Sequence, residues 1–76
     1  MEEKFIKSFA EALEIEDASN LNLDTIFREL PEWDSLAYLS LIAMIDEEYG
    51  VVIDGNEFRK LQTIGDILSF IKKSGA

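Results

Sequence analysis

The sequence predicts an all-α fold, a small four-helix bundle with three main helices, one short helix and a long first loop. Apolar residues recur at spacings of three and four in separate stretches, which is the period of an amphipathic helix. Residue types that begin or end helices flank these stretches. The chain has 76 residues, of which 47% are apolar, as expected for one small globular domain over residues 1–76. We place the helices at about residues 2–14, 35–49, 56–61 and 64–73.

The N-terminal helix is predicted from a stripe of core-forming residues: Phe5, Ile6, Phe9, Ala10 and Leu13. Turn-forming residues are then frequent from Ile15 to Leu30, so this stretch is expected to be a long loop. Four apolar residues interrupt the loop and are expected to pin it to the helices: Leu21, Leu23, Ile26 and Phe27.

The helix at 35–49 has clear boundaries, since Pro31 precedes it and Gly50 follows it. Asp34 is placed as the N-cap, where its carboxylate accepts a hydrogen bond from a free backbone N–H. Ser35 is then the first helical residue, at the positive end of the helix dipole, where an attached anion is favoured. The core face of this helix is expected to consist of Tyr38, Leu41, Ile42, Ile45 and Tyr49.

A second face of the same helix begins at Ser35 and holds Leu36, Leu39, Ser40, Ala43, Asp46 and Glu47. Leu36 and Leu39 are predicted to stay partly exposed beside the serine, as a docking surface. The alternative for Leu39 is the ordinary half-burial of a helix in a small protein. The helix ends in three carboxylates, where its dipole disfavours negative charge: Asp46, Glu47 and Glu48. We interpret them as a surface for a basic partner or a divalent cation; the alternative is a solvated acidic end.

The C-terminal third is read from local signals. Gly50 to Ile53 is expected to be an extended linker, because the chain offers no partner strand. Thr63 and Asp66 fit a capping box for the last helix, whose core stripe is Ile64, Ile67, Leu68 and Ile71. The segment 54–57 alternates oxygen ligands but lacks the rest of a calcium loop, so no metal site is predicted.

Composition excludes several function classes. The chain has no His and no Cys, which removes the common activated nucleophiles, so it is not predicted to be an enzyme. The net charge of −9 argues against nucleic acid and favours partners with basic patches. No stretch resembles a signal peptide or could span a bilayer. We therefore expect a cytoplasmic monomer.

The run Asp34-Ser35-Leu36 at the start of an amphipathic helix resembles the attachment motif of the acyl carrier protein family. The family's ordering continues through residues 47–50, 52–53, 61–64 and Ile71. The resemblance implies that a phosphopantetheinyl transferase attaches a 4′-phosphopantetheine arm to Ser35, and that the thiol of the arm holds an acyl group as a thioester. It implies that Asp34 and Leu36 flank the arm, and that acyl-loading and acyl-processing enzymes dock through basic patches. The docking residues expected on this basis are Trp33, Leu36, Leu39, Ala43, Asp46 and Glu47.

The chain departs from the family pattern at two places. Carriers of bulk fatty-acid synthesis usually have acidic residues early in this helix, where this chain has Ala37 and Ser40. They often have Gly two residues before the Asp, where this chain has Glu32 followed by Trp33. These departures favour a specialised lipid, polyketide or related pathway, with Trp33 near the root of the arm or against a partner. The alternatives are an aminoacyl or peptidyl carrier loaded by an adenylating enzyme, and an acidic helical adaptor without an arm.

Overall fold

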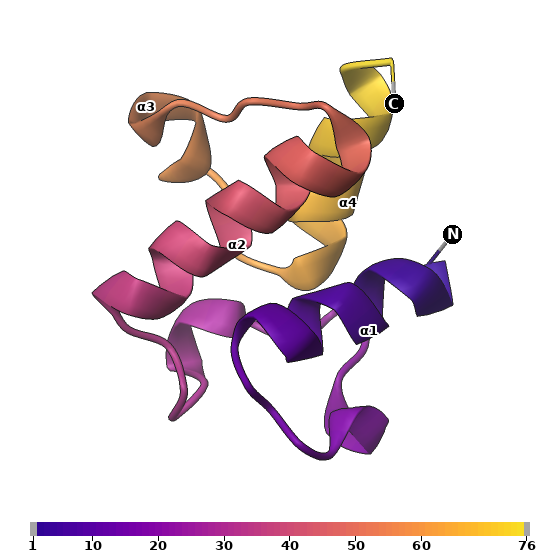
Figure 1. The fold of residues 1–76 in the computed structure, drawn as a ribbon, viewed down its shortest axis with the longest axis vertical. Coiled ribbons are helices and arrows are strands. Elements are labelled where there is room, and N and C mark those ends of the chain that lie inside the picture. Colours follow the sequence, from indigo (N-terminus) through magenta and orange to yellow (C-terminus); the bar gives the residue numbers. More distant parts are fainter. Residues whose placement is uncertain (1, 76) are drawn as a thin grey trace.

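The computed structural model describes residues 2–75, and these residues form helices and loops without a strand. The main helices are α1 (Glu2–Ala12), α2 (Ser35–Tyr49) and α4 (Ile64–Lys73), and α3 (Gly55–Phe58) is a single turn. Two 3₁₀ turns lie in the first loop, η1 (Ala18–Asn20) and η2 (Phe27–Glu29). Figure 1 shows α2 crossing the molecule between α1 and α3, with α4 behind it. The all-α bundle with a long first loop is confirmed.

Helix α2 begins and ends where its sequence signals place it. The Asp34 carboxylate accepts a hydrogen bond of 2.7 Å from the backbone N–H of Ala37, which satisfies one of the free donors of the first turn. Gly50 takes the left-handed conformation with φ of 67° at the C-cap, where a glycine has no steric penalty.

The buried face of α2 differs from the predicted stripe. Leu41 and Ile45 are fully buried as expected, but Ala37 and Met44 are buried as well. The predicted core residues Tyr38, Ile42 and Tyr49 are only half-buried. Helix α1 packs along the side of α2 that holds Ala37 and Met44, and the Ser8 Oγ donates to the Glu48 Oε1 at 3.0 Å between the two helices.

Helix α1 ends at Ala12, so the predicted range of 2–14 was two residues too long. Glu14 adopts a left-handed conformation with φ of 57°. The N–H of Ile15 donates to the carbonyl of Ala10 at 2.8 Å, and the N–H of Glu14 donates to the carbonyl of Glu11 at 3.1 Å. This is the hydrogen-bond pattern of a Schellman motif, which usually has glycine at the left-handed position. Because Glu14 stands at this position instead of a glycine, the end of α1 cannot be recognised from residue types alone.

Helix α3 covers Gly55–Phe58, so the predicted range of 56–61 was shifted and too long. Asp54 caps it by accepting a 2.8 Å hydrogen bond from the N–H of Glu57. The guanidinium of Arg28 then donates to the carbonyls of Phe58 and Leu61, at 2.8 and 3.0 Å. After Phe58 the chain continues in tighter turns, because the N–H groups of Lys60 and Leu61 donate to the carbonyls of Glu57 and Phe58 at 3.1 and 3.0 Å.

The first loop is fixed to the start of α4 by backbone hydrogen bonds. The N–H groups of Ile64 and Gly65 donate to the carbonyls of Thr25 and Leu23, at 3.0 and 2.8 Å. A Cβ atom added at Gly65 would lie 2.8 Å from the Leu23 oxygen, so only glycine allows this close approach.

The expectation that apolar side chains pin this loop is confirmed for three of them. Phe27 is fully buried, and Leu21 and Leu23 are half-buried. It is wrong for Ile26, which is 41% exposed. Ile26 instead forms an isolated backbone bridge with Thr63, so its backbone is held while its side chain points outward.

The extended linker and the capping box are also confirmed. Between α2 and α3, Val51 and Ile53 are buried and Val52 between them is exposed. At the start of α4, the Thr63 Oγ1 accepts from the N–H of Asp66 at 3.0 Å, and the Asp66 carboxylate accepts in return from the N–H of Thr63 at 3.1 Å. Within residues 2–75, no helix is both long enough and apolar enough to cross a bilayer.

The capping box gives the stability a predictable dependence on pH. Hydrogen bonds from the N–H groups of Gln62 and Thr63 hold the pKa of Asp66 below its ordinary value. A lowered pKa in the folded state stabilises the fold above the unfolded pKa of about 3.9, and this stabilisation is lost as the pH falls below that value. We therefore expect Asp66→Asn to lower the free energy of unfolding at pH 7, and the deficit to shrink below pH ~4. Urea unfolding at several pH values measures this; a deficit independent of pH would contradict it.

The left-handed residue after α1 gives a second prediction. A non-glycine residue in this conformation is strained by about 1–2 kcal/mol, and glycine removes the strain but adds entropy to the unfolded chain, about 0.4–1 kcal/mol. We expect Glu14→Gly to raise the melting temperature by about 4 °C. Glu14→Ala is the control, because it removes the same charge and keeps the Cβ atom. Equal melting of the two variants would show that charge, not strain, is responsible.

Candidate functional site

Ser35 is the first residue of α2 and is exposed to solvent. The preceding Asp34 has extended backbone, and its carboxylate is engaged with the Ala37 N–H. The serine therefore lies at the positive end of a helix of 15 residues. Its hydroxyl is open to an approaching enzyme, and a phosphate attached to it would be favoured there.

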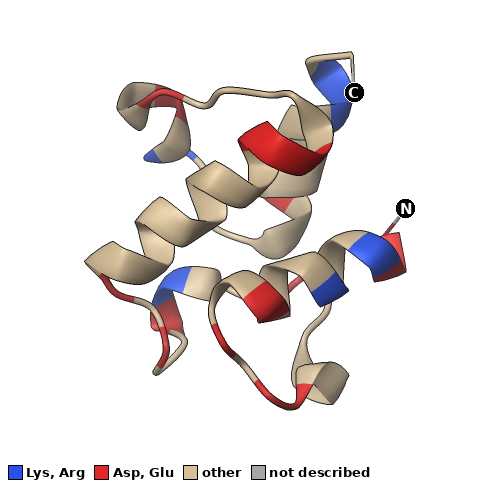
Figure 2. Ribbon diagram, viewed as in Figure 1, with Lys and Arg blue, Asp and Glu red and all other residues tan. Residues whose placement is uncertain are grey.

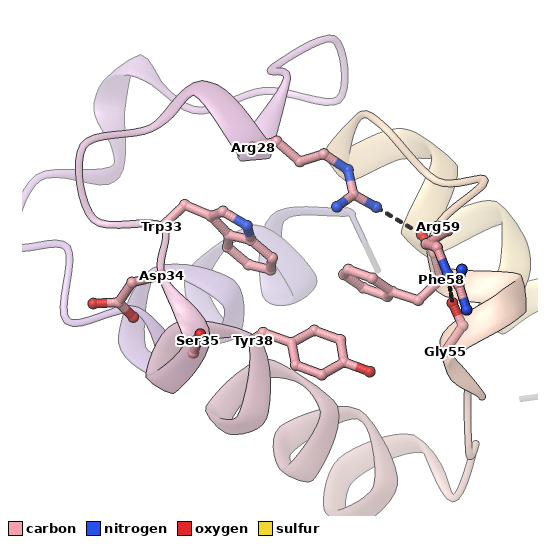
Figure 3. A pocket seen from close by; sticks show the side chains of 8 residues that line it. All are labelled: Arg28, Trp33, Asp34, Ser35, Tyr38, Gly55, Phe58 and Arg59. Atoms are coloured by element: carbon pink, nitrogen blue, oxygen red, sulfur yellow. Dashed lines mark hydrogen bonds between the residues drawn. The ribbon is translucent and has the colours of Figure 1, made fainter.

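A groove of about 450 Å³ opens to solvent beside Ser35, between the start of α2 and the short helix α3. Figure 3 shows the side chains of Trp33 and Tyr38 on one wall and those of Phe58 and Arg59 on the other, with Arg28 above. Asp34 and Gly55 complete the lining. A volume of this size is in the range of small-molecule sites.

The inner wall of the groove consists of aromatic rings in contact. The ring centre of Trp33 lies 4.9 Å from that of Phe27, and it is stacked on Phe58 at 6.0 Å with an angle of 12°. Tyr38 meets Phe58 at 5.0 Å in an edge arrangement, a geometry that aromatic pairs prefer. Trp33 thus packs against rings of its own chain and leaves part of its surface facing the groove.

Arg28 and Arg59 are the two arginines of the chain, and both line this groove. Arg28 lies 5.1 Å from the ring centre of Phe27 and 5.2 Å from that of Phe58. Arg59 donates to the carbonyl of Gly55 at 3.3 Å and to the amide oxygen of Asn56 at 2.7 Å. All of their hydrogen-bond acceptors are neutral oxygens. Within residues 2–75 the one ion pair joins Lys60 to Glu57, at 3.7 Å.

The docking residues expected on α2 form an exposed strip. Leu36 is 74% exposed and Leu39 is 60% exposed, so their predicted exposure is confirmed and the half-buried alternative for Leu39 is wrong. Ala43, Asp46 and Glu47 are exposed along the same helix. Figure 2 shows the acidic end of α2, with further acidic residues on α1 and the first loop.

The carboxylates at the end of α2 are not arranged as a metal site. Among residues 2–75, no three acidic side chains come together as ligands for one cation. Glu48 is engaged with Ser8 of α1. The divalent-cation interpretation of this helix end is therefore wrong. The two other interpretations, a surface for a basic partner and a solvated acidic end, remain.

Sequence reasoning placed Ser35 and Asp34 but missed the far wall of the groove. That wall comes from Arg28, Gly55, Phe58 and Arg59, and Tyr38 was assigned to the core alone. The scarcity of arginine in this acidic chain could have drawn attention to this wall. Arg28 lies in η2 and contacts both the ring and the carbonyl of Phe58, and Arg59 follows Phe58 directly in the sequence.

Comparison with known proteins agrees with this geometry. A family profile described as "Phosphopantetheine attachment site" matches residues 3–71. The chain is 36% identical over 73 residues to an acyl carrier protein of Rickettsia canadensis, covering 96% of this chain and 84% of the relative. It is 31% identical over 72 residues to an acyl carrier protein of Tropheryma whipplei, covering 91% of this chain and 88% of the relative. The chain therefore belongs to the acyl carrier protein family, whose prosthetic group is a covalently attached 4′-phosphopantetheine.

Proposed function

We propose that this protein carries a 4′-phosphopantetheine arm on Ser35 and delivers an acyl group, held as a thioester, to partner enzymes of a specialised lipid, polyketide or related pathway. The observation that carries the proposal is the exposed hydroxyl of Ser35 at the start of α2. Acyl carrier proteins are carriers rather than catalysts, and the family works with a phosphopantetheinyl transferase and with acyl-processing enzymes.

The residues around Ser35 fit the arm. The helix dipole favours a phosphate at this position, and the neighbouring Asp34 carboxylate is turned to the Ala37 N–H as the helix cap. In the attachment reaction the Ser35 Oγ bonds to the phosphorus next to the pantetheine while the diphosphate bond of coenzyme A breaks. Adenosine 3′,5′-bisphosphate is the leaving group, and a base of the transferase takes the hydroxyl proton. When bound, the arm supplies the thiol that this cysteine-free chain lacks.

The exposed strip of α2 is the proposed docking surface. Leu36 and Leu39 offer apolar contacts beside the serine. Ala43 is exposed between these leucines and the acidic end, and its small side chain allows a partner to approach the helix closely. Asp46 and Glu47 are exposed and provide negative charge for basic patches of partners. The exposed part of Trp33 extends this surface into the groove.

Two features support a specialised pathway. Ala37 and Ser40 occupy the early positions of α2 where carriers of bulk fatty-acid synthesis usually have acidic residues, so this part of the helix carries no negative charge. Trp33 is held by the rings of Phe27 and Phe58, which gives the approach to the serine a bulky, rigid shape. Partners of this carrier therefore meet a surface unlike that of carriers with early acidic residues and a glycine before the motif.

Attachment is tested by intact-protein mass. After incubation with coenzyme A and a transferase of broad specificity, we expect the mass to rise by one phosphopantetheine arm. Ser35→Ala should show no increase, because the accepting hydroxyl is gone. Ser40→Ala is the matched control, since it removes another exposed serine of α2 and should still be modified. An unmodified wild-type chain would favour the acidic adaptor without an arm.

Docking is tested by the rate of that modification. We expect Glu47→Lys to lower kcat/KM of the transferase by about tenfold, equivalent to ~1.4 kcal/mol, because it reverses a charge on the docking surface. Glu3→Lys makes the same change of net charge on exposed α1 and should stay within about twofold. If both variants slow the reaction equally, overall charge and not this surface guides the partner.

A further inference from the structure

The charged residues that line the groove beside Ser35 are Arg28, Arg59 and Asp34, which give it a net positive charge in a protein of net charge −9. The chain has 16 acidic and seven basic residues, and both of its arginines face this one groove. We propose that the groove receives the free end of the acyl group and that Arg28 and Arg59 select a short group ending in a carboxylate. This proposal rests on the attachment of the arm to Ser35.

The two arginines hold positive charge in fixed places. Arg28 is bound by the carbonyls of Phe58 and Leu61 and lies over two rings, and Arg59 is bound by Gly55 and Asn56. These contacts use the Nε and Nη2 atoms of each guanidinium, so the Nη1 atoms make no hydrogen bond within residues 2–75. No carboxylate forms an ion pair with either side chain in this part of the chain. A carboxylate ligand gains charge-assisted hydrogen bonds there without displacing a protein partner.

The position of the arginines distinguishes the cargo from the phosphate of the arm. That phosphate is bonded to Ser35, whereas Arg59 lies across the groove from Ser35, after the short helix α3 (Figure 3). A flexible arm can fold back and place the end of its cargo against this far wall. The positive charge on the far wall therefore suits the cargo rather than the attachment point.

The inner wall limits the length of the cargo. Phe58 lines the groove and is 3% exposed, and the fully buried ring of Phe27 packs behind it, with the two ring centres 5.4 Å apart. Trp33 closes the space beside them. The groove therefore ends at packed rings instead of continuing into the core, and a long chain finds no room beyond them. A short acyl group that ends in a carboxylate matches this lining. Its aliphatic part contacts the aromatic rings, and its carboxylate contacts the arginines.

The test compares two cargoes that differ at one end. Succinyl-coenzyme A and butyryl-coenzyme A are used with a broad transferase to load the protein, and intact mass confirms complete loading. In a protein of net charge −9, an additional surface carboxylate lowers stability. The proposal predicts the reverse, with the succinyl form melting about 4 °C or more above the butyryl form at low ionic strength. The difference should shrink at high ionic strength.

Two variants test whether the difference in melting temperature between the succinyl and butyryl forms arises in the groove. Arg59→Gln removes one charge of the far wall, and the difference between the succinyl and butyryl forms should fall by at least half. Lys60→Gln is the matched control, because it removes the neighbouring cation outside the groove and should leave the difference unchanged. Trp33 is the one tryptophan of the chain, so its indole N–H signal in NMR reports the groove directly. This signal should move in the succinyl form and less in the butyryl form.

The outcomes separate this proposal from the proposed function. If Ser35 accepts no arm, the carrier function fails and this proposal fails with it. If the arm is attached but the succinyl form melts level with or below the butyryl form, only the cargo proposal is overturned. It is also overturned if the arm without cargo moves the Trp33 signal as far as the succinyl form does, because the groove then binds the arm itself.

Discussion

The packing of Phe27 is the interaction on which the rest of the site depends. Its ring is fully buried and lies 6.5 Å from Phe9 of α1, 4.9 Å from Trp33 and 5.4 Å from Phe58 of α3. One side chain of the first loop therefore joins α1, α3 and the residues that lead into α2. Loss of a buried aromatic ring typically costs about 3–5 kcal/mol, a large share of the ~5–15 kcal/mol that stabilise a domain. The geometry around Ser35 thus depends on a residue that never faces the groove.

Backbone hydrogen bonds make the long loop a structural element in its own right. The first N–H groups of a helix need partners from outside the helix. In α4 the N–H groups of Ile64 and Gly65 find them in the loop carbonyls of Thr25 and Leu23. The same hydrogen bonds give the loop carbonyls of Thr25 and Leu23 a donor beside the core, where a backbone oxygen without a partner is unfavourable. The loop and the last helix therefore fix each other, and the path of the chain toward Asp34 is set by residues far along the sequence.

The features that could be predicted from the sequence are those set by contacts between residues close together in the chain. The cap at Asp34, the glycine at position 50 and the box at Thr63 each act within four residues, so α2 and α4 begin and end at the predicted positions. The end of α1 was misplaced because Glu14 adopts a conformation that usually identifies a glycine. The groove was not predicted because Arg28 and Phe58, which meet through a hydrogen bond, are 30 residues apart. Spacing along a chain does not reveal such contacts without the fold.

The short helix α3 contributes fewer buried residues to the core than each of the main helices. It is a single turn with one buried residue, Phe58, whose ring packs against Phe27 and whose carbonyl accepts a hydrogen bond from the guanidinium of Arg28. Displacing it withdraws one ring from the core and leaves the packing of α1 against α2 and α4 in place. The wall that carries Arg59 therefore rests on one buried ring, whereas the bundle that presents Ser35 rests on the packing of α1 against α2 and α4.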